Sequence, residues 1–222
     1  MNLVNTYIYE ITGTENYQIE SFFSSYRLNQ INSSSNPIII NKMIITEHFL
    51  KFVIEKELNK SINIINIETT KNGKPYLVDE NLFFNITHKG NLILIATAND
   101  EVSIDIEKVN IKHLKISNKL YNDKVYYSIN RIIKDFTIKE SYIKFFGLNI
   151  LTNMKLINHD DKLIEGPSGT ISYKAFKYKD YYITVAKELE FKVNFIKIKK
   201  LNSNDLINYN KYIKIFKSKE EE

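Results

Sequence analysis

Residues 91–108 read NLILIATANDEVSIDIEK, two β-rich runs on either side of the turn-forming pair Asn99–Asp100. In the second run, the two-residue period of a strand places three apolar side chains on one face and Ser103, Asp105 and Glu107 on the other. The α-carbons of the two acidic residues would then lie roughly 6.5–7 Å apart, so both carboxylates could reach one cation. Taken alone, this fragment favours a different interpretation, an edge strand whose acidic face is solvated.

The segments around this stretch alternate between strand and helix patterns. Toward the N-terminus, VNTYIYEI, NIINIE and FFNIT are typical of strands, and residues 38–58 have helical periodicity. We expect NIINIE, FFNIT, NLILIATA and EVSIDIE to pair into one sheet. Toward the C-terminus, the helical period returns over residues 128–146, and GTISYKAFKY, YYITVAKE and FKVNFIKI predict three more strands.

This order of elements predicts an α+β fold made of two similar-sized halves. We expect the halves to comprise residues 1–108 and 109–222 and to join near residues 108–112. No repeat between them is visible at the level of single residues. The basic C-terminal tail, which ends in SKEEE, is expected to be frayed.

The composition indicates a globular protein without thiol chemistry. Of the 222 residues, 43% are hydrophobic and 26% are charged, a balance that does not suit a disordered chain. The absence of cysteine excludes disulfides, a thiol nucleophile and a cysteine-ligated zinc or iron–sulfur centre. Oxygen ligands and four histidines remain for any metal site, and they favour a hard cation.

The charge and hydropathy of the chain bear on its partners and location. A formal net charge of +5 suits a polyanionic partner: nucleic acid, a nucleotide cofactor, an acidic protein or a membrane surface. The abundance of Asn, Ile and Lys is equally compatible with AT-rich coding, in which case the basic excess carries no function. The first residues show no basic leader, and no stretch approaches the ~20 apolar residues of a membrane span. We therefore expect a soluble cytoplasmic protein.

The predicted helix over residues 128–146 carries a third acidic residue, Glu140, on its apolar stripe. The other members of this stripe are Ile133, Phe136, Ile143 and Gly147. A buried carboxylate needs a partner, so a metal shared with the two strand carboxylates would explain this position. Lys144, one turn later, could instead form an ordinary ion pair with Glu140 on the helix surface.

Two loops supply basic side chains and donors. The turn NGKPY presents Lys74, and FFNITHKG ends a strand with Thr87, His88 and Lys89. Donors at strand ends and turns suit a phosphate group. Each piece alone is weak, because a single His or Lys in a loop is usually just solvated.

Taken together, four ordered motifs resemble those of the Sfp-type 4′-phosphopantetheinyl transferases. They are GKPY (73–76), FNITHKG (84–90), VSIDIEKV (102–109) and FTIKESYIKFFGLNI (136–150). That family shows a GKP turn, an FNISH strand end, a GIDIE strand and a W-x-x-KES-x-x-K-x-x-G helix in this order. Weaker similarity extends to INKMIITEHFL and YYITVA, so the resemblance covers most of the chain. The departures are Ser103 for glycine, Thr87 for serine, Phe136 for tryptophan, and Thr46 where the family often has glycine.

The resemblance implies a fold and a set of roles. The family fold is a pseudo-twofold pair of α+β halves with coenzyme A in the cleft between them. The residues that match its magnesium ligands are Asp105, Glu107 and Glu140. Those that match its contacts to coenzyme A phosphates are Lys74, Thr87 and His88. Lys144 would contact the reacting pyrophosphate, and Lys42, with Arg27, would help to hold the 3′-phosphate.

The implied reaction is attack of a carrier-protein serine on the β-phosphate of coenzyme A, with 3′,5′-ADP leaving. Lys144 and His88 would stabilise the phosphate charge together with magnesium, and Glu140 or a metal-held water would accept the serine proton. The expected partners are coenzyme A and an apo acyl or peptidyl carrier protein, with no nucleic acid and no membrane. The expected state is a monomer.

Other functions remain open at this point. A magnesium-dependent nuclease would also use an acidic cluster beside basic residues, although it leaves GKPY and ITHK unexplained. A relative that binds carrier proteins without turnover is a second alternative, and the intact carboxylate trio argues against it. A basic nucleic-acid-binding module is a third.

Overall fold

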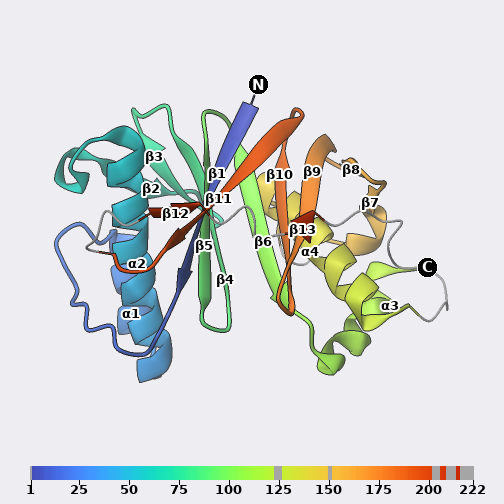
Figure 1. The fold of residues 1–222 in the computed structure, drawn as a ribbon, viewed down its shortest axis with the longest axis horizontal. Coiled ribbons are helices and arrows are strands. Elements are labelled where there is room, and N and C mark those ends of the chain that lie inside the picture. Colours follow the sequence, from blue (N-terminus) through green and yellow to red (C-terminus); the bar gives the residue numbers. More distant parts are fainter. Residues whose placement is uncertain (1, 123–126, 150–151, 202–205, 209–213, 216–222) are drawn as a thin grey trace.

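The computed structural model describes residues 2–122, 127–149, 152–201, 206–208 and 214–215. Within these ranges the chain is an α+β protein with helices on two flanks and strands between them (Figure 1), which confirms the predicted fold class. The strands are β1 (Asn2–Glu10), β2 (Asn66–Thr69), β3 (Pro75–Val78), β4 (Phe83–Lys89), β5 (Leu92–Ala98), β6 (Val102–Lys108), β7 (Asn158–His159), β8 (Leu163–Gly166), β9 (Gly169–Tyr178), β10 (Tyr181–Lys187), β11 (Phe191–Ile198), β12 (Leu206–Asn208) and β13 (Lys214–Ile215). The helices are α1 (Ser25–Asn32), α2 (Pro37–Leu58), α3 (Ser117–Leu120) and α4 (Ile129–Phe145), and the short 3₁₀ segments are η1 (Ile62–Ile64), η2 (Ile111–Ile116) and η3 (Met154–Leu156).

The first sheet has the strand order β12-β11-β1-β5-β4. Strand β1 pairs in parallel with β11 and antiparallel with β5. On β5, Ile93 and Ile95 share a buried cluster with Phe49 and Val53 of α2. This helix therefore covers one face of the first sheet, and its burial of apolar area against the strands is the main stabilising contribution on that side.

The second sheet has the strand order β6-β10-β9-β8-β7, with β13 beside β9. Helix α4 covers one face, where Ile138 and Tyr142 share a cluster with Ile171 and Ala175 of β9. The opposite face packs against the first sheet. The β6 residues in this inter-sheet core are Val102, Ile104 and Ile106, which confirms the alternation predicted for EVSIDIE.

Helices α2 and α4 begin and end at recognisable signals. Asn36 caps α2 by accepting from two backbone N–H groups, and Pro37 follows it at the first helical position. Ser128 caps α4 by accepting from the backbone N–H of Arg131. At the other end Gly147 takes φ 61°, a left-handed conformation that suits glycine. Both predicted helices are confirmed, and none of the described helices has the length and hydropathy to cross a bilayer.

The prediction that NIINIE, FFNIT, NLILIATA and EVSIDIE form one sheet is wrong. Strands β4 and β5 pair in the first sheet, β6 lies in the second, and β2 pairs only with β3 in a separate two-stranded sheet. The first two residues of NIINIE belong to the 3₁₀ segment η1 (Ile62–Ile64), which the Ser61 side chain caps. The turn after β5 redirects the chain into a different sheet, and local periodicity carries no information about that pairing.

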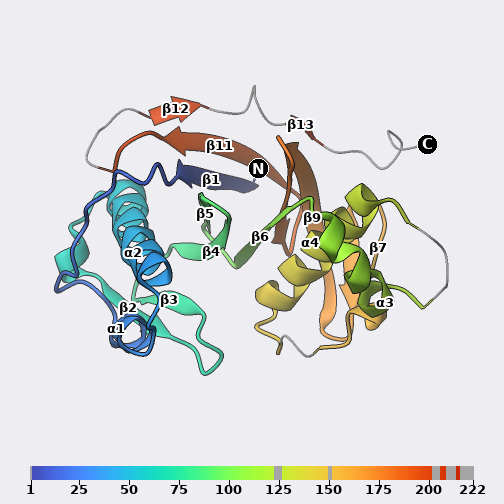
Figure 2. The same cartoon turned by 90° about the horizontal axis from the view of Figure 1, so that it is seen from below.

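Each of the two larger sheets contains strands from both sides of the boundary expected at residue 108. Strand β6 lies in the second sheet, and β11 and β12 return to the first. In Figure 2, β4 and β6 lie between α2 and α4. The division into halves 1–108 and 109–222 stays a prediction, and the tail ending in SKEEE lies outside the described residues.

Candidate functional site

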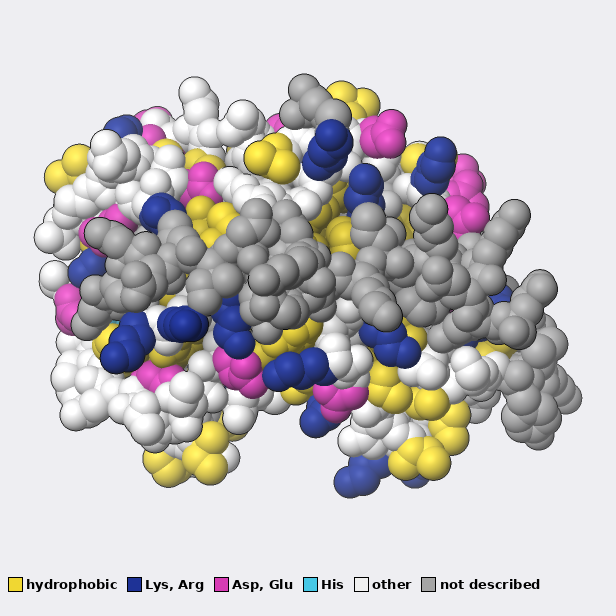
Figure 3. Space-filling view, viewed as in Figure 1, with side chains coloured by type: hydrophobic (Ala, Val, Ile, Leu, Met, Phe, Trp, Pro, Cys, Tyr) yellow, Lys and Arg dark blue, Asp and Glu magenta, His cyan; other side chains and the backbone are white. Residues whose placement is uncertain are grey.

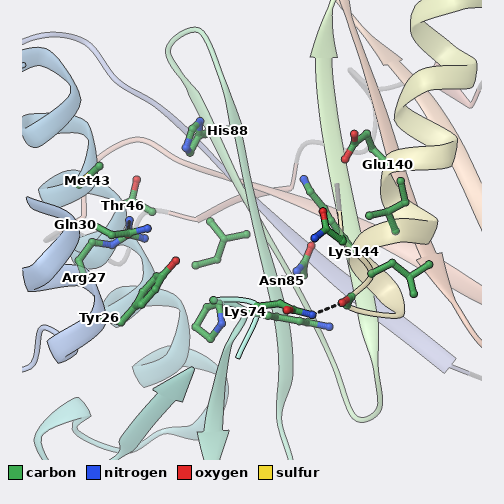
Figure 4. Close-up of a pocket in the computed structure, with 18 of the residues that line it drawn as sticks. Tyr26, Arg27, Gln30, Met43, Thr46, Lys74, Asn85, His88, Glu140 and Lys144 are labelled. Carbon is green, nitrogen blue, oxygen red and sulfur yellow. Dashed lines mark hydrogen bonds between the residues drawn. The ribbon is translucent and has the colours of Figure 1, made fainter. Parts of the chain in front are cut away.

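A cavity of about 850 Å³ lies between the N-terminal helices and the C-terminal end of α4. Figure 4 shows Tyr26, Arg27 and Gln30 of α1 with Thr46 of α2 on one side, and Glu140 and Lys144 of α4 on the other. Asn85 and His88 of β4 lie between these two walls. The sequence-predicted residues that line the cavity are Arg27, Lys42, Lys74, His88, Glu140 and Lys144.

The acidic side of the site is built on β6. Asp105 is only 5% exposed, so the alternative of a solvated acidic face does not hold for this residue. Ser103, on the same face, donates from Oγ to the Ser141 carbonyl oxygen at 2.8 Å. This bond fixes β6 against α4 and brings Asp105 to the helix that carries Glu140.

Lys144 connects the helix to both neighbouring strands. Its Nζ lies 2.5 Å from Asp105 Oδ1, 3.1 Å from Thr87 Oγ1 and 3.3 Å from the Ile104 carbonyl oxygen. Thr87 Oγ1 also donates to Asp105 Oδ1 at 3.3 Å. Lys144 therefore pairs with Asp105. It does not form the ordinary helix-surface ion pair with Glu140 that the sequence left open. Thr87 is buried beside this pair and does not line the cavity.

Glu140 lies where negative charge is unfavourable. Burial, followed by the charge of Asp105 and a smaller contribution from Glu107, raises the pKa of the Glu140 carboxyl to about 7, against the opposing effect of Lys144. A carboxyl group with a pKa near neutrality can exchange a proton under physiological conditions. The charges of Asp105 and Glu107 thus act on Glu140, and the assignment of these three residues to one metal site stays a prediction.

The fit of this cluster to a cation can be judged from its oxygen atoms. Asp105 Oδ2 is buried and makes no hydrogen bond. Lys89 Nζ lies 2.6 Å from Glu107 Oε2, but without the angles of a hydrogen bond. In the described part of the chain, no three acidic or histidine side chains are arranged as a formed metal site. The donor set, all carboxylate oxygen and partly unsatisfied, still fits a hard divalent cation.

The basic side of the cavity is held by contacts within the N-terminal part. Arg27 Nε donates to Glu47 Oε1 at 2.7 Å, which orients the guanidinium from α1. Lys42 Nζ donates to the Gly90 carbonyl oxygen at 2.8 Å. Lys74, on the turn before β3, pairs with Glu101. Among the described residues, no acidic side chain pairs with Lys42, and burial and the charge of Lys89 lower its pKa.

The pKa of His88 reflects the positive potential on the basic side of the cavity. Although its side chain is exposed at the opening, the surrounding walls desolvate the ring. This desolvation, together with the charges of Lys42, Lys144 and Arg27, lowers the pKa of His88 to about 4. A site that disfavours an additional proton favours an anion for the same electrostatic reason.

We expect His88 to titrate near pH 4 in the free protein, well below the ordinary value of 6.5. Adding a phosphate-bearing ligand should raise this pKa, because its negative charge offsets Lys42 and Arg27. Ring-proton or ring-nitrogen NMR over pH 3.5–8 measures both states. His113, outside the cavity, serves as the internal comparison and should not respond to the ligand. A free-state pKa above 6, or one unmoved by ligand, would contradict the electrostatics described here.

Some residues of the site were not identified from the sequence. Asn85 Oδ1 accepts from the backbone N–H of Ile104 at 3.0 Å and so ties β4 to β6 across two different sheets. Asn72 Nδ2 donates to the Gly147 carbonyl oxygen at 2.5 Å, between the β2–β3 turn and the end of α4. Asn85 lies within the FNITHKG motif, which was a usable signal. Nothing in the local sequence marks Asn72 beyond its position next to GKPY.

Comparison with known proteins confirms the resemblance inferred from the motifs. No protein-family model matches the chain. The 4′-phosphopantetheinyl transferase Gsp of Aneurinibacillus migulanus is 34% identical over 110 residues, 44% of this chain and 46% of that protein. The putative 4′-phosphopantetheinyl transferase of Haemophilus influenzae is 29% identical over 132 residues, 52% and 56% of the two chains. The 4′-phosphopantetheinyl transferase Sfp of Bacillus subtilis is 24% identical over 147 residues, 62% and 66%. The chain thus spans about half to two thirds of the length of these relatives.

Proposed function

We propose that this protein transfers the 4′-phosphopantetheine group of coenzyme A to a serine of an apo acyl or peptidyl carrier protein. The observation that carries the proposal is the position of the four motifs: three of them line one cavity, and the strand motif lies directly behind it. GKPY and FNITHKG supply its basic and polar wall, and the helix motif supplies Glu140 and Lys144, backed by Asp105 from the strand motif. The similarity to curated 4′-phosphopantetheinyl transferases supports the same activity.

In this proposal the basic wall binds the phosphates of coenzyme A. Lys42 and Arg27 would hold the 3′-phosphate, with His88 and Lys74 at the neighbouring phosphate oxygens. Thr87 acts from behind the cavity, because its hydroxyl contacts Asp105 and Lys144. Its proposed role is therefore to orient Lys144 and not to contact the cofactor directly.

The reaction proceeds at the β-phosphorus. The serine oxygen forms a bond to this atom, the bond to the bridging oxygen breaks, and 3′,5′-ADP leaves. Glu140 accepts the serine proton, for which a pKa near neutrality is suitable. Lys144 stabilises the negative charge that grows on the phosphate oxygens. Asp105, Glu107 and Glu140 would hold magnesium, whose chemistry when bound is to neutralise pyrophosphate charge as a Lewis acid.

The proposal extends to the symmetry, the oligomeric state and the location of the protein. The two halves would be related by a pseudo-twofold axis, and the protein would act as a monomer and work in the cytoplasm. Size-exclusion chromatography with light scattering tests the oligomeric state directly.

An incubation with coenzyme A, Mg²⁺ and an apo carrier protein separates this function from its alternatives. The carrier should gain the mass of one phosphopantetheine group, and a parallel DNA sample should remain intact. Degraded DNA with an unmodified carrier would instead select the nuclease. On the face shown in Figure 3, Lys and Arg side chains are interspersed with Asp and Glu.

Binding of coenzyme A and dephospho-coenzyme A should distinguish the phosphate contacts. We expect Lys42→Met to weaken coenzyme A binding roughly tenfold and dephospho-coenzyme A binding much less, since a charge-assisted bond to the 3′-phosphate is lost. Isothermal titration calorimetry measures both ligands. Lys51→Met, on the same helix as Lys42 but outside the cavity, is the matched control. Equal losses for the two ligands would move this contact elsewhere along the cofactor.

A further inference from the structure

The Lys144 ammonium occupies an oxygen-lined niche. Its three donors each meet an acceptor: the Asp105 carboxylate, the Thr87 hydroxyl and the Ile104 carbonyl. A niche lined by a carboxylate, a hydroxyl and a carbonyl oxygen is also the type of surroundings that a hard divalent cation selects. Lys144 therefore occupies surroundings that suit a metal ion.

The carboxylate cluster needs a positive charge at this position. Asp105 is nearly inaccessible, and Glu107 and Glu140 are both partly buried. Without a cation, these three side chains would repel one another in surroundings that screen charge poorly. Lys144 supplies one positive charge through Asp105, and Lys89 supplies another beside Glu107.

Lys144 can also leave this position. Its side chain is 28% exposed and lines the cavity, whereas Asp105 lies behind it. The ammonium can therefore turn from Asp105 into the cavity without crossing the core. The second oxygen of Asp105, Oδ2, is buried, has no hydrogen-bond partner among the described residues and so is available to an incoming cation.

We propose that Lys144 is the resident counter-ion of Asp105 and that a divalent cation replaces it there, which releases the ammonium into the cavity. This inference rests on the proposed function, because the cation and the anionic cofactor belong to the same site. Two cations on one carboxylate repel each other, so arrival of the second displaces the first. The released Lys144 then adds a positive charge where the pyrophosphate binds, and metal and cofactor each favour the other's binding by linkage.

Magnesium binding without coenzyme A or carrier tests the exchange. We expect Lys144→Met to bind Mg²⁺ roughly tenfold more tightly than the wild type in calorimetry, because the resident competitor is gone. Lys42→Met is the control for a general effect of removing positive charge. Its ammonium bonds the Gly90 carbonyl oxygen, and its loss should change Mg²⁺ affinity less than about threefold.

NMR of the lysine ammonium groups gives a second measurement on the wild type. The Nζ–H₃⁺ signal of Lys144, assigned by its loss in Lys144→Met, should be visible without metal and should shift or broaden as Mg²⁺ is added. Unchanged or weaker Mg²⁺ affinity in Lys144→Met overturns the inference, as does an equal gain in both variants. Absence of Mg²⁺ binding in all three proteins overturns it together with the metal site. Failure of carrier modification alone, with tighter binding in Lys144→Met, would refute the proposed function and leave the exchange standing.

Discussion

Replacing Glu140 with glutamine is expected to remove turnover and, in metal-free buffer above neutral pH, to raise the unfolding temperature. The pKa of Glu140 is about 7 in the folded protein against 4.5 for an ordinary glutamate. Folding therefore loses stability as pH rises from 4.5 to 7 and Glu140 ionises, and the neutral amide removes this loss. Turnover should fall by roughly 10²–10⁴-fold, because the glutamine amide cannot accept the serine proton.

Asp105→Asn provides the companion measurement. It should also remove turnover, but it should lower stability, because Lys144 loses its charged partner at 2.5 Å. The two variants thus share a loss of activity and differ in the sign of their stability change. Glu165→Gln, an exposed substitution on β8, is the control and should alter neither property. Wild-type turnover in Glu140→Gln or Asp105→Asn at saturating Mg²⁺ would contradict the site assignment.

Replacing Lys139 with methionine is expected to cause the largest loss of stability. This lysine belongs to the KES motif, yet it is only 5% exposed and does not line the cavity. Its Nζ donates to the carbonyl oxygens of Leu120 and Met154, at 2.8 and 3.0 Å. These carbonyls lie in α3 and η3, so the ammonium ties both segments to α4.

Methionine has a similar length but no donor, so the Leu120 carbonyl loses its Lys139 bond at up to about 3 kcal/mol, while the Met154 carbonyl keeps the backbone N–H of Ile157. For a protein of this size, a loss of about 3 kcal/mol lowers the unfolding temperature by roughly 6–12 °C. Differential scanning calorimetry measures the shift, and Lys119→Met, exposed in neighbouring α3, is the control. An unfolding temperature equal to that of the control would show that relief of the buried charge offsets the lost bonds.

The local pattern of the chain predicts most elements of the fold. The alternation of EVSIDIE places its apolar residues in the inter-sheet core, and the periods of α2 and α4 agree with the observed helices. Helix α1 was not predicted, since in SYRLNQIN only Ile31 is fully buried and the apolar stripe is too weak. Secondary structure that depends on one buried contact leaves little periodicity to detect.

Strand pairing could not be predicted from local sequence. Strand β1 pairs in parallel with β11, and Asn194 of β11 donates to Asn5 of β1 across a separation of 189 residues. Strand β5 is buried on both faces, and the composition of such a strand is compatible with either sheet. The assignment of β6 to the second sheet therefore depends on tertiary packing against α4, where Ser103 contacts Ser141.

The sequence predicted which residues belong to the candidate site, but it did not predict which of them contact one another. The sequence identified six residues that line the cavity, as well as Asp105 behind it. It could not show that Lys144 pairs with Asp105, because a spacing of four residues equally predicts a pair with Glu140. The position of Thr87 behind the cavity was likewise not predictable, since it depends on which face of β4 meets β6.

The most direct test of the central claim is a mass measurement on the carrier protein coupled to measurement of the released nucleotide. With coenzyme A and Mg²⁺, the carrier should gain one phosphopantetheine group, located on a single serine by fragmentation. One equivalent of 3′,5′-ADP should appear for each carrier modified, and a carrier with that serine replaced by alanine should gain nothing. An unmodified carrier, or 3′,5′-ADP released at the same rate without carrier, would contradict the proposed transfer.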